Sequence, residues 1–114
     1  MNEEIKSIFG DNLIVNGEVI PFSHLRYEGK SRRFVTWAGL GEVPNLSAND
    51  EPLFSVASVD IDIFSDGNYL DIIKEIKNKM KNNEWVWTGD SPEMYEEDTG
   101  LYHKTCSFEK ERIL

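Results

Sequence analysis

Two carboxylates spaced two residues apart, Asp60 and Asp62, are the side chains of this sequence best suited to chemistry. They lie in an alternating run, and residues two apart on a strand point to the same face. With His103, Glu97 or Asp98 they could bind a divalent metal ion, as the carboxylates of nuclease sites do. An acidic strand face in water is the simpler interpretation, because 21 of the 114 residues are acidic and no second ligand motif of defined spacing accompanies the pair. We therefore expect no metal site and no cofactor.

The histidines and the single cysteine form no recognisable catalytic motif. His24 and His103 stand in neither an H-x-x-x-H nor an H-E-x-x-H arrangement, so a zinc site has little support. Cys106 follows His103 by three residues, which on a strand places the two side chains on opposite faces and argues against a nucleophile–base pair. We expect Cys106 to be a small apolar residue on a buried strand face, and we expect the protein not to be an enzyme.

Composition limits the class of protein. The length of 114 residues and the 39% of hydrophobic residues predict one folded domain over residues 1–114. A formal net charge of −9 repels nucleic-acid phosphates and anionic lipids, so we expect neither tight nucleic-acid binding nor membrane association. One cysteine cannot form an internal disulfide, and no stretch approaches the roughly 20 apolar residues of a membrane span. We expect a soluble protein made in the cytoplasm.

The first half of the chain predicts a helix and a hairpin. Residues Glu3–Phe9 favour a short helix that ends at Gly10, a residue that readily stops helices. The runs Asn12–Val15 and Glu18–Phe22 flank Asn16-Gly17, and Asn-Gly between apolar runs is a strong hairpin signal because both turn positions need positive φ. An N-terminal β-hairpin is therefore expected.

Two further segments precede the second half. His24–Tyr27 and Arg33–Leu40 flank Glu28–Ser31, which has the composition of a turn, so a second hairpin is expected there. Residues Gly41–Glu51 contain a proline, two asparagines and small side chains. This composition predicts an exposed loop, and a loop of this length is either a floppy excursion or a binding loop.

The second half predicts a strand, a helix and two more strands. Pro52–Ser65 alternates with one apolar face, Asn68–Asn83 has the apolar stripe of an amphipathic helix, and Glu84–Trp87 and Leu101–Phe108 are strand-like. The elements together predict an α+β (α/β two-layer) domain with a mainly antiparallel sheet of about four strands plus the N-terminal hairpin. The short N-terminal helix and the one long amphipathic helix are expected to pack on one face of this sheet.

Aromatic and basic residues indicate where a partner could bind. Trp85 and Trp87 lie two apart, and we expect one to be in the core and the other to be a partly exposed interface anchor. Arg26, Arg32 and Arg33 lie near aromatic residues, which could form a weak nucleic-acid surface. A charged edge strand or a protein interface is the favoured interpretation of this patch.

Taken in order, these elements resemble the tail terminator or tail completion proteins of long-tailed bacteriophages and related prophage elements. The likeness spans nearly the whole chain. It is closest in the strand Ser58–Ile63 with the helix that follows, and in the closing run Asp98–Lys104, which leads to the aromatic Phe108.

The resemblance implies a structural virion protein without catalytic residues. Such proteins assemble as a ring, commonly a hexamer, on the last ring of tail-tube subunits at the head-proximal end of the tail. The ring stops growth of the tube and offers the surface that joins the tail to the head connector. The implied partners are further copies of the chain, the tail tube protein and the head–tail connector protein, and DNA passes through the ring without specific binding.

Exposure and composition, rather than any family motif, select the residues expected to contact these partners. They are the basic pair after the predicted turn and the irregular loop, namely Arg32, Arg33, Glu42, Val43, Asn45, Leu46, Asn49 and Asp50. A ring needs two different patches on each subunit, and a basic and an acidic patch would be complementary.

Three other functions stay open at this point. One is a neck or head-completion connector, which differs from a tail terminator in its partner. Another is a small metal-dependent nuclease that uses Asp60 and Asp62. The last is an acidic immunity or adaptor domain, because strong acidity suits an inhibitor of a basic enzyme.

Overall fold

The computed structural model describes residues 2–46 and 52–113, which form seven strands and two helices. Strands make up more than half of the described residues and helices about a fifth. The elements, in chain order, are α1 (Asn2–Phe9), β1 (Asn12–Val15), β2 (Glu18–His24), β3 (Arg33–Leu46), β4 (Pro52–Ser65), α2 (Leu70–Asn82), β5 (Val86–Asp90), β6 (Met94–Glu96) and β7 (Leu101–Ile113). Neither helix is long and apolar enough to cross a membrane, within the part of the chain that is described.

The expectation of an α/β two-layer domain with about four strands and one long helix is wrong. The protein is mostly β, with a seven-stranded mixed sheet and two short helices. The difference arises where local composition predicted irregular structure. Residues 41–46 continue β3, and β7 runs on to Ile113, because β3 pairs with the 14-residue β4 from Pro52 to Ser65 and β7 pairs with it from Phe54 to Ser65. Cross-strand pairing over that length overrides the turn tendency of Gly41 and Pro44.

The strands lie in the order β1-β2-β3-β4-β7-β5, with β6 also paired to β7. Strands β2 and β3 are parallel, with Phe22 opposite Val35. Because a hairpin joins antiparallel strands, the prediction of a second hairpin here is wrong. Residues 25–32 instead form a crossover that returns the chain to the start of β3. The hydroxyl of Tyr27 accepts a hydrogen bond from the backbone N–H of Ser31 at 2.9 Å, which shapes the segment that had the composition of a turn.

The N-terminal helix and hairpin are confirmed. Helix α1 ends at Gly10, whose φ of 67° is left-handed and whose N–H donates to the carbonyl of Lys6 at 2.7 Å. Asn16 and Gly17 have φ values of 51° and 82°, the positive values that a tight hairpin turn needs. Strands β1 and β2 are antiparallel around this turn. Both features depend on residues close in sequence.

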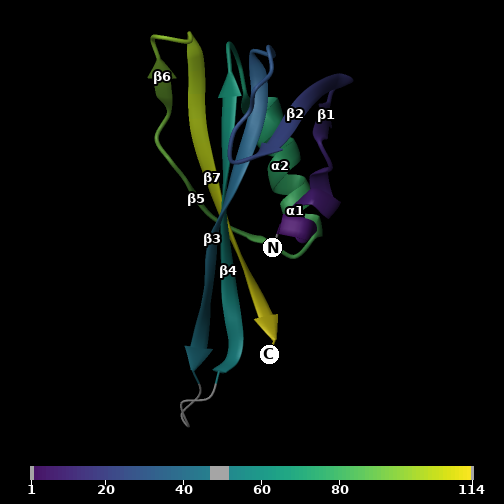
Figure 1. The fold of residues 1–114 in the computed structure, drawn as a ribbon, viewed down its shortest axis with the longest axis vertical. Helices are drawn as coiled ribbons and strands as arrows, with labels where there is room; N and C mark the ends of the chain where they lie inside the picture. The colour runs from purple at the N-terminus through teal and green to yellow at the C-terminus, as the bar shows by residue number, and fades with distance from the viewer. Residues whose placement is uncertain (1, 47–51, 114) are drawn as a thin grey trace.

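The core lies between the sheet and the two helices, which pack on the same side of it (Figure 1). Helix α2 contributes the apolar stripe predicted for it, with Ile72, Ile73, Ile76 and Met80 buried. The sheet and α1 contribute further buried residues, including Ile5, Phe9, Val35, Trp37, Val59, Ile61, Ile63, Cys106 and Phe108. Burying each large apolar side chain contributes about 1.5–3 kcal/mol, so this body holds most of the stability of the fold.

Candidate functional site

Three strands extend beyond the body as a narrow ribbon (Figure 1). We define the ribbon as residues 38–46 of β3, 52–60 of β4 and 107–113 of β7, which pair side by side. On the outer edge of β3, only residues 35–37 are paired, with β2. On the outer edge of the ribbon part of β7, only residues up to Glu109 are paired, with β5. Among the described residues no strand covers the outer edge of β3 beyond Trp37 or that of β7 beyond Glu109. Unpaired edges of this kind are templates for pairing with another chain.

Exposed apolar side chains accompany the free edges of the ribbon. Val43 on β3 is 67% exposed and Ile113 on β7 is 94% exposed. Leu40, also exposed, lies at a bulge where the register shifts between Gly39 and Gly41. Apolar residues gathered beside unpaired backbone are typical of a protein interface.

On the helix-facing side of the ribbon, ion pairs take over beyond the last core residues, Ala57 and Phe108. The carboxylate of Glu4 in α1 contacts Lys110 Nζ at 2.8 Å and an Nη of Arg112 at 2.5 Å. Arg112 also contacts Glu42 at 3.2 Å, and Glu42 accepts a hydrogen bond from the hydroxyl of Ser55 at 2.7 Å. Burial raises the pKa of Glu4, but the hydrogen bonds from Lys110 and Arg112 outweigh it and lower the pKa overall. These contacts tie the ribbon to the body.

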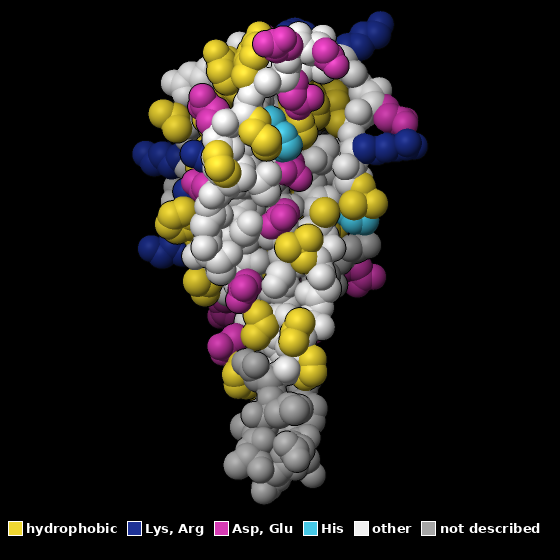
Figure 2. Space-filling view, turned by 90° about the vertical axis from the view of Figure 1, so that its left-hand side faces the viewer, with side chains coloured by type: hydrophobic (Ala, Val, Ile, Leu, Met, Phe, Trp, Pro, Cys, Tyr) yellow, Lys and Arg dark blue, Asp and Glu magenta, His cyan; other side chains and the backbone are white. Residues whose placement is uncertain are grey.

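The opposite side of the sheet is not covered by the helices and is both acidic and aromatic. Tyr27, Phe34, Phe64 and His103 form a stack across the crossover and three strands, with successive ring centroids 4.5, 4.7 and 4.2 Å apart. Figure 2 shows the molecule from the left-hand side of Figure 1, with acidic and apolar side chains mixed along its centre and basic side chains mostly at its margins. We call the side of the sheet away from the helices the open face.

Asp60 and Asp62 lie together on the open face, as the alternation predicts. Asp62 Oδ1 lies 3.0 Å from His103 Nε2 and accepts a hydrogen bond from the hydroxyl of Thr105 at 2.5 Å. Asp60 accepts a hydrogen bond from the hydroxyl of Ser107 at 2.7 Å. Among the described residues, no group of three His, Cys, Asp or Glu side chains is arranged to hold a metal ion. Both carboxylates accept hydrogen bonds from hydroxyl groups of β7 across the strand pair.

The two arginines predicted to contact partners bind within the chain. Arg33 forms ion pairs with Glu18 of β2 and with Asp71 of α2, the latter at 2.8 Å, and its side chain is only 19% exposed. Arg32 donates to the carbonyl of Thr99 at 2.8 Å and is more exposed. Arg33 thus joins β3 to the hairpin and to α2. A contact of Arg32 with a partner stays a prediction.

The predicted contact loop is a strand over the part that the structure describes. Strand β3 contains Glu42, Val43, Asn45 and Leu46, so the prediction of a loop over these residues is wrong. The other two predicted contact residues, Asn49 and Asp50, lie outside the described residues. Of these residues, Val43 is exposed on the ribbon and Glu42 is held by Arg112.

The paired tryptophans behave as expected. Trp85 is 2% exposed and Trp87 is 50% exposed. Trp87 is held in place by two neighbours, because Lys77 Nζ lies 4.1 Å from the ring centroid and the indole N–H donates to Asp90 at 2.8 Å. A fixed, half-exposed indole can anchor a partner. The two-residue spacing of Trp85 and Trp87 is the sequence feature that predicted one buried and one partly exposed tryptophan.

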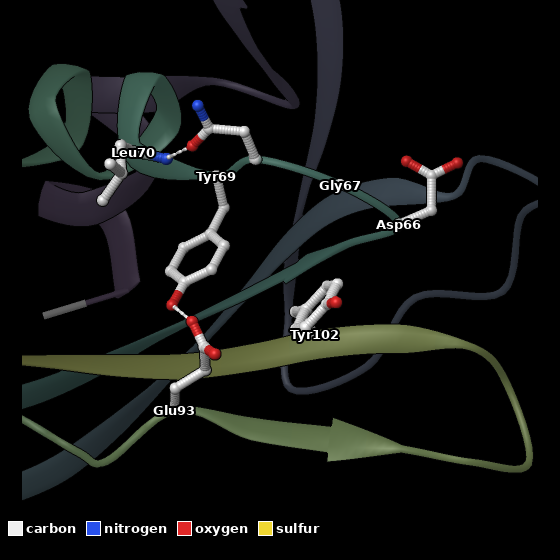
Figure 3. A pocket seen from close by; sticks show the side chains of 7 residues that line it. Asp66, Gly67, Tyr69, Leu70, Glu93 and Tyr102 are labelled. Carbon is white, nitrogen blue, oxygen red and sulfur yellow. Dashed lines mark hydrogen bonds between the residues drawn. The ribbon is translucent and has the colours of Figure 1, made fainter.

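A pocket of about 460 Å³, which no pattern in the sequence indicated, lies where β4 leads into α2 (Figure 3). Tyr69 and Tyr102 line it, and the hydroxyl of Tyr69 donates a hydrogen bond to the carboxylate of Glu93. This bond, together with burial, raises the pKa of Tyr69 to about 12. Because Glu93 directly precedes β6, the bond fixes the start of the β6–β7 hairpin against α2.

No known protein family matches this chain, and no curated protein shows significant sequence similarity to it. Function must therefore be inferred from the residues and geometry of the chain itself.

Proposed function

We propose that this protein is a structural virion protein that caps a bacteriophage tail tube as a ring. The observation that carries the proposal is the ribbon, which has one unpaired edge on β3 and a different one on β7. A closed ring of identical subunits uses two different patches on each subunit. Edges on opposite sides of one sheet supply such patches, because the β7 edge of one copy can pair with the β3 edge of the next.

The directions of the strands suit this assembly. Strands β3 and β7 are both antiparallel to β4, so they run in the same direction. Copies related by rotation about an axis along the strands would pair the two edges in parallel, and Val43 and Ile113 would lie on the same face of the continued sheet. The sheet would continue from copy to copy, with the open face of every copy on the same side of the ring.

The acidic open face suits a channel for DNA. With Asp60 and Asp62 directed toward the lumen, the ring would repel phosphates and let DNA slide without sticking. The resemblance of the sequence adds to this, and the strand Ser58–Ile63 meets the closing run Asp98–Lys104 where Ile63 pairs with Lys104. The partners would be the tail tube protein and the head–tail connector, at the head-proximal end of the tail.

The proposal is tested by adding the protein to tail tubes and imaging the tubes by negative-stain electron microscopy. We expect a ring at one end of each tube and shorter tubes when the protein is present during tube assembly. Val43→Lys should abolish capping, because a charge on a free edge blocks strand pairing. The matched control is Val19→Lys, at an exposed valine on β2 outside the ribbon. Uncapped tubes with the wild-type protein would overturn the proposal, and binding to portal complexes instead would favour the neck connector.

A further inference from the structure

The crossover between β2 and β3 presents an exposed apolar residue in an unfavourable backbone conformation. Leu25 has a φ of 69°, in the left-handed region that branched and bulky residues rarely adopt, and it is 64% exposed. Its N–H donates to the carbonyl of Trp37 at 2.8 Å, which holds the residue in place. Strain of this kind persists only where the surroundings impose it, and it is concentrated at functional positions.

Two basic residues follow Leu25 on the crossover. Arg26 is highly exposed, and among the described residues it forms an ion pair only with the exposed Glu28 of the same segment. Lys30 is exposed and forms no ion pair with any described residue. We call residues 25–30 the basic crossover. Its fixed apolar side chain is followed by two cations, Arg26 and Lys30, with Glu28 between them, in a chain whose net charge is −9.

The hairpin formed by β6 carries the opposite chemistry. Residues 93–98, which we call the acidic hairpin, contain four carboxylates and no cation. Met94 and Tyr95 lie among them and are 45% and 55% exposed. Glu97 and Asp98 are exposed and form no ion pair within the described part of the chain.

The acidic hairpin is held rigid before any partner arrives. Glu93 accepts the hydrogen bond from Tyr69, and the ring of Tyr95 lies against Tyr102 with centroids 5.0 Å apart. Strand β6 pairs with the start of β7, and the turn that follows is tied by Arg32, which donates to the carbonyl of Thr99. A rigid surface loses little conformational entropy on binding, so its contacts convert into affinity.

We propose that the acidic hairpin of one copy docks on the basic crossover of the next copy. Met94 and Tyr95 would cover Leu25, and the hairpin carboxylates would meet Arg26 and Lys30. The occupant is a second copy of this chain, because each surface matches the other in both charge and apolar content. The acidic hairpin lies at the β7 side of the sheet and the crossover follows β2 at the β3 side, so the contact is head to tail. The inference rests on the proposed ring and adds a second contact above the ribbon edges.

The decisive experiment is a charge swap. Lys30→Glu and Glu97→Lys should each weaken self-association about tenfold, measured by sedimentation velocity at low ionic strength with tube protein present and absent. The variant that carries both changes should recover to within about threefold of wild type, because the opposite charges meet again. Lys6→Glu, at an exposed lysine of α1, is the matched control and should change nothing. A double variant no better than either single one would overturn the inference, as would single variants that associate like wild type.

A second variant separates contact from folding. Leu25→Asn keeps the left-handed conformation, since asparagine adopts positive φ readily, and it removes the apolar side chain. We expect an unchanged circular dichroism spectrum and a loss of association of at least tenfold, whereas unchanged association would count against the docking role. If wild-type rings cap tubes but all these variants do so equally well, the inference fails and the proposed function stands. If the charge swap behaves as expected but no tube is ever capped, the proposed function fails and the contact stands.

Discussion

The three strands of the ribbon also run through the body, yet the two parts are stabilised in different ways. In the body, Ile61 and Ile63 of β4 are buried in the core beneath the helices. In the ribbon, the same side of the sheet carries Ser55 and Arg112, and hydrogen bonds and ion pairs replace the core. The comparison teaches that pairing alone can extend a strand, while apolar burial decides which part of it is stable on its own. The ribbon is the part left free to meet a partner.

Removing a core side chain from the body should have the largest effect on stability. Ile61→Ala deletes a fully buried side chain and should lower the free energy of unfolding by about 2–5 kcal/mol. The matched change in the ribbon, Val43→Ala, removes an exposed side chain and should stay within about 0.5 kcal/mol. Urea denaturation followed by circular dichroism measures both. Equal losses would show that the ribbon is as much a part of the stable unit as the body.

Reversing the charge of Arg33 tests the tie between the strands and α2. Arg33→Glu leaves Glu18 and Asp71 facing a like charge and should cost about 2–3 kcal/mol of unfolding free energy. Arg32→Glu should cost less than about 1 kcal/mol, because that side chain is half exposed. Thermal denaturation of the two variants gives the comparison. A smaller loss of stability for Arg33→Glu than for Arg32→Glu would contradict the conclusion that Arg33 joins β3 to the hairpin and to α2.

Acid should loosen the ribbon through Glu4. The folded state lowers the pKa of Glu4, so its ion pairs stabilise the fold above the ordinary pKa of the carboxyl group and are lost as pH falls through the lowered value. We expect the free energy of unfolding to decrease in that acidic range, and Glu4→Gln to remove part of this dependence. Amide hydrogen exchange should show faster opening at Lys110 and Arg112 in the variant. Unchanged exchange there would mean that the ion pairs do not hold the ribbon.

The smallest effect at neutral pH concerns Tyr69. Its pKa is raised to about 12, so its hydrogen bond to Glu93 stabilises the fold below the ordinary value of 10.0 and is lost as pH rises from there to about 12. Ultraviolet titration of the phenol should show one late-titrating tyrosine, and this signal should disappear in Tyr69→Phe. Tyr95→Phe, at an exposed tyrosine, is the control. A late titration that persists in Tyr69→Phe would refute the assignment.

The sequence could predict the features that depend on near neighbours. The turn at Asn16-Gly17, the apolar stripe of α2 and the shared face of Asp60 and Asp62 all follow from residues a few positions apart. The parallel pairing of β2 with β3 could not be predicted, because the crossover has the composition of an ordinary turn. Its geometry depends on a bond from Leu25 to the distant Trp37.

The candidate surfaces were predicted less well than the fold elements. The continuation of β3 through Pro44 depends on its partner β4, and composition alone favoured a loop. Arg33 of β3 forms ion pairs with β2 and α2, which are distant in sequence. The burial of its side chain therefore could not be predicted from the residues next to it in the sequence. The acidic hairpin did have a local signal, four carboxylates around Met94 and Tyr95, that could have been read as a surface.

The central claim is that the free edges of the ribbon join copies of this chain into a ring on a tail tube. Electron cryomicroscopy of the protein bound to tail tubes, at a resolution that separates strands, tests it most directly. We predict a ring in which residues 38–46 of β3 lie parallel to residues 110–113 of β7 in the neighbouring copy. A ring in which both edges remain unpaired, or tubes without any ring, would contradict the claim.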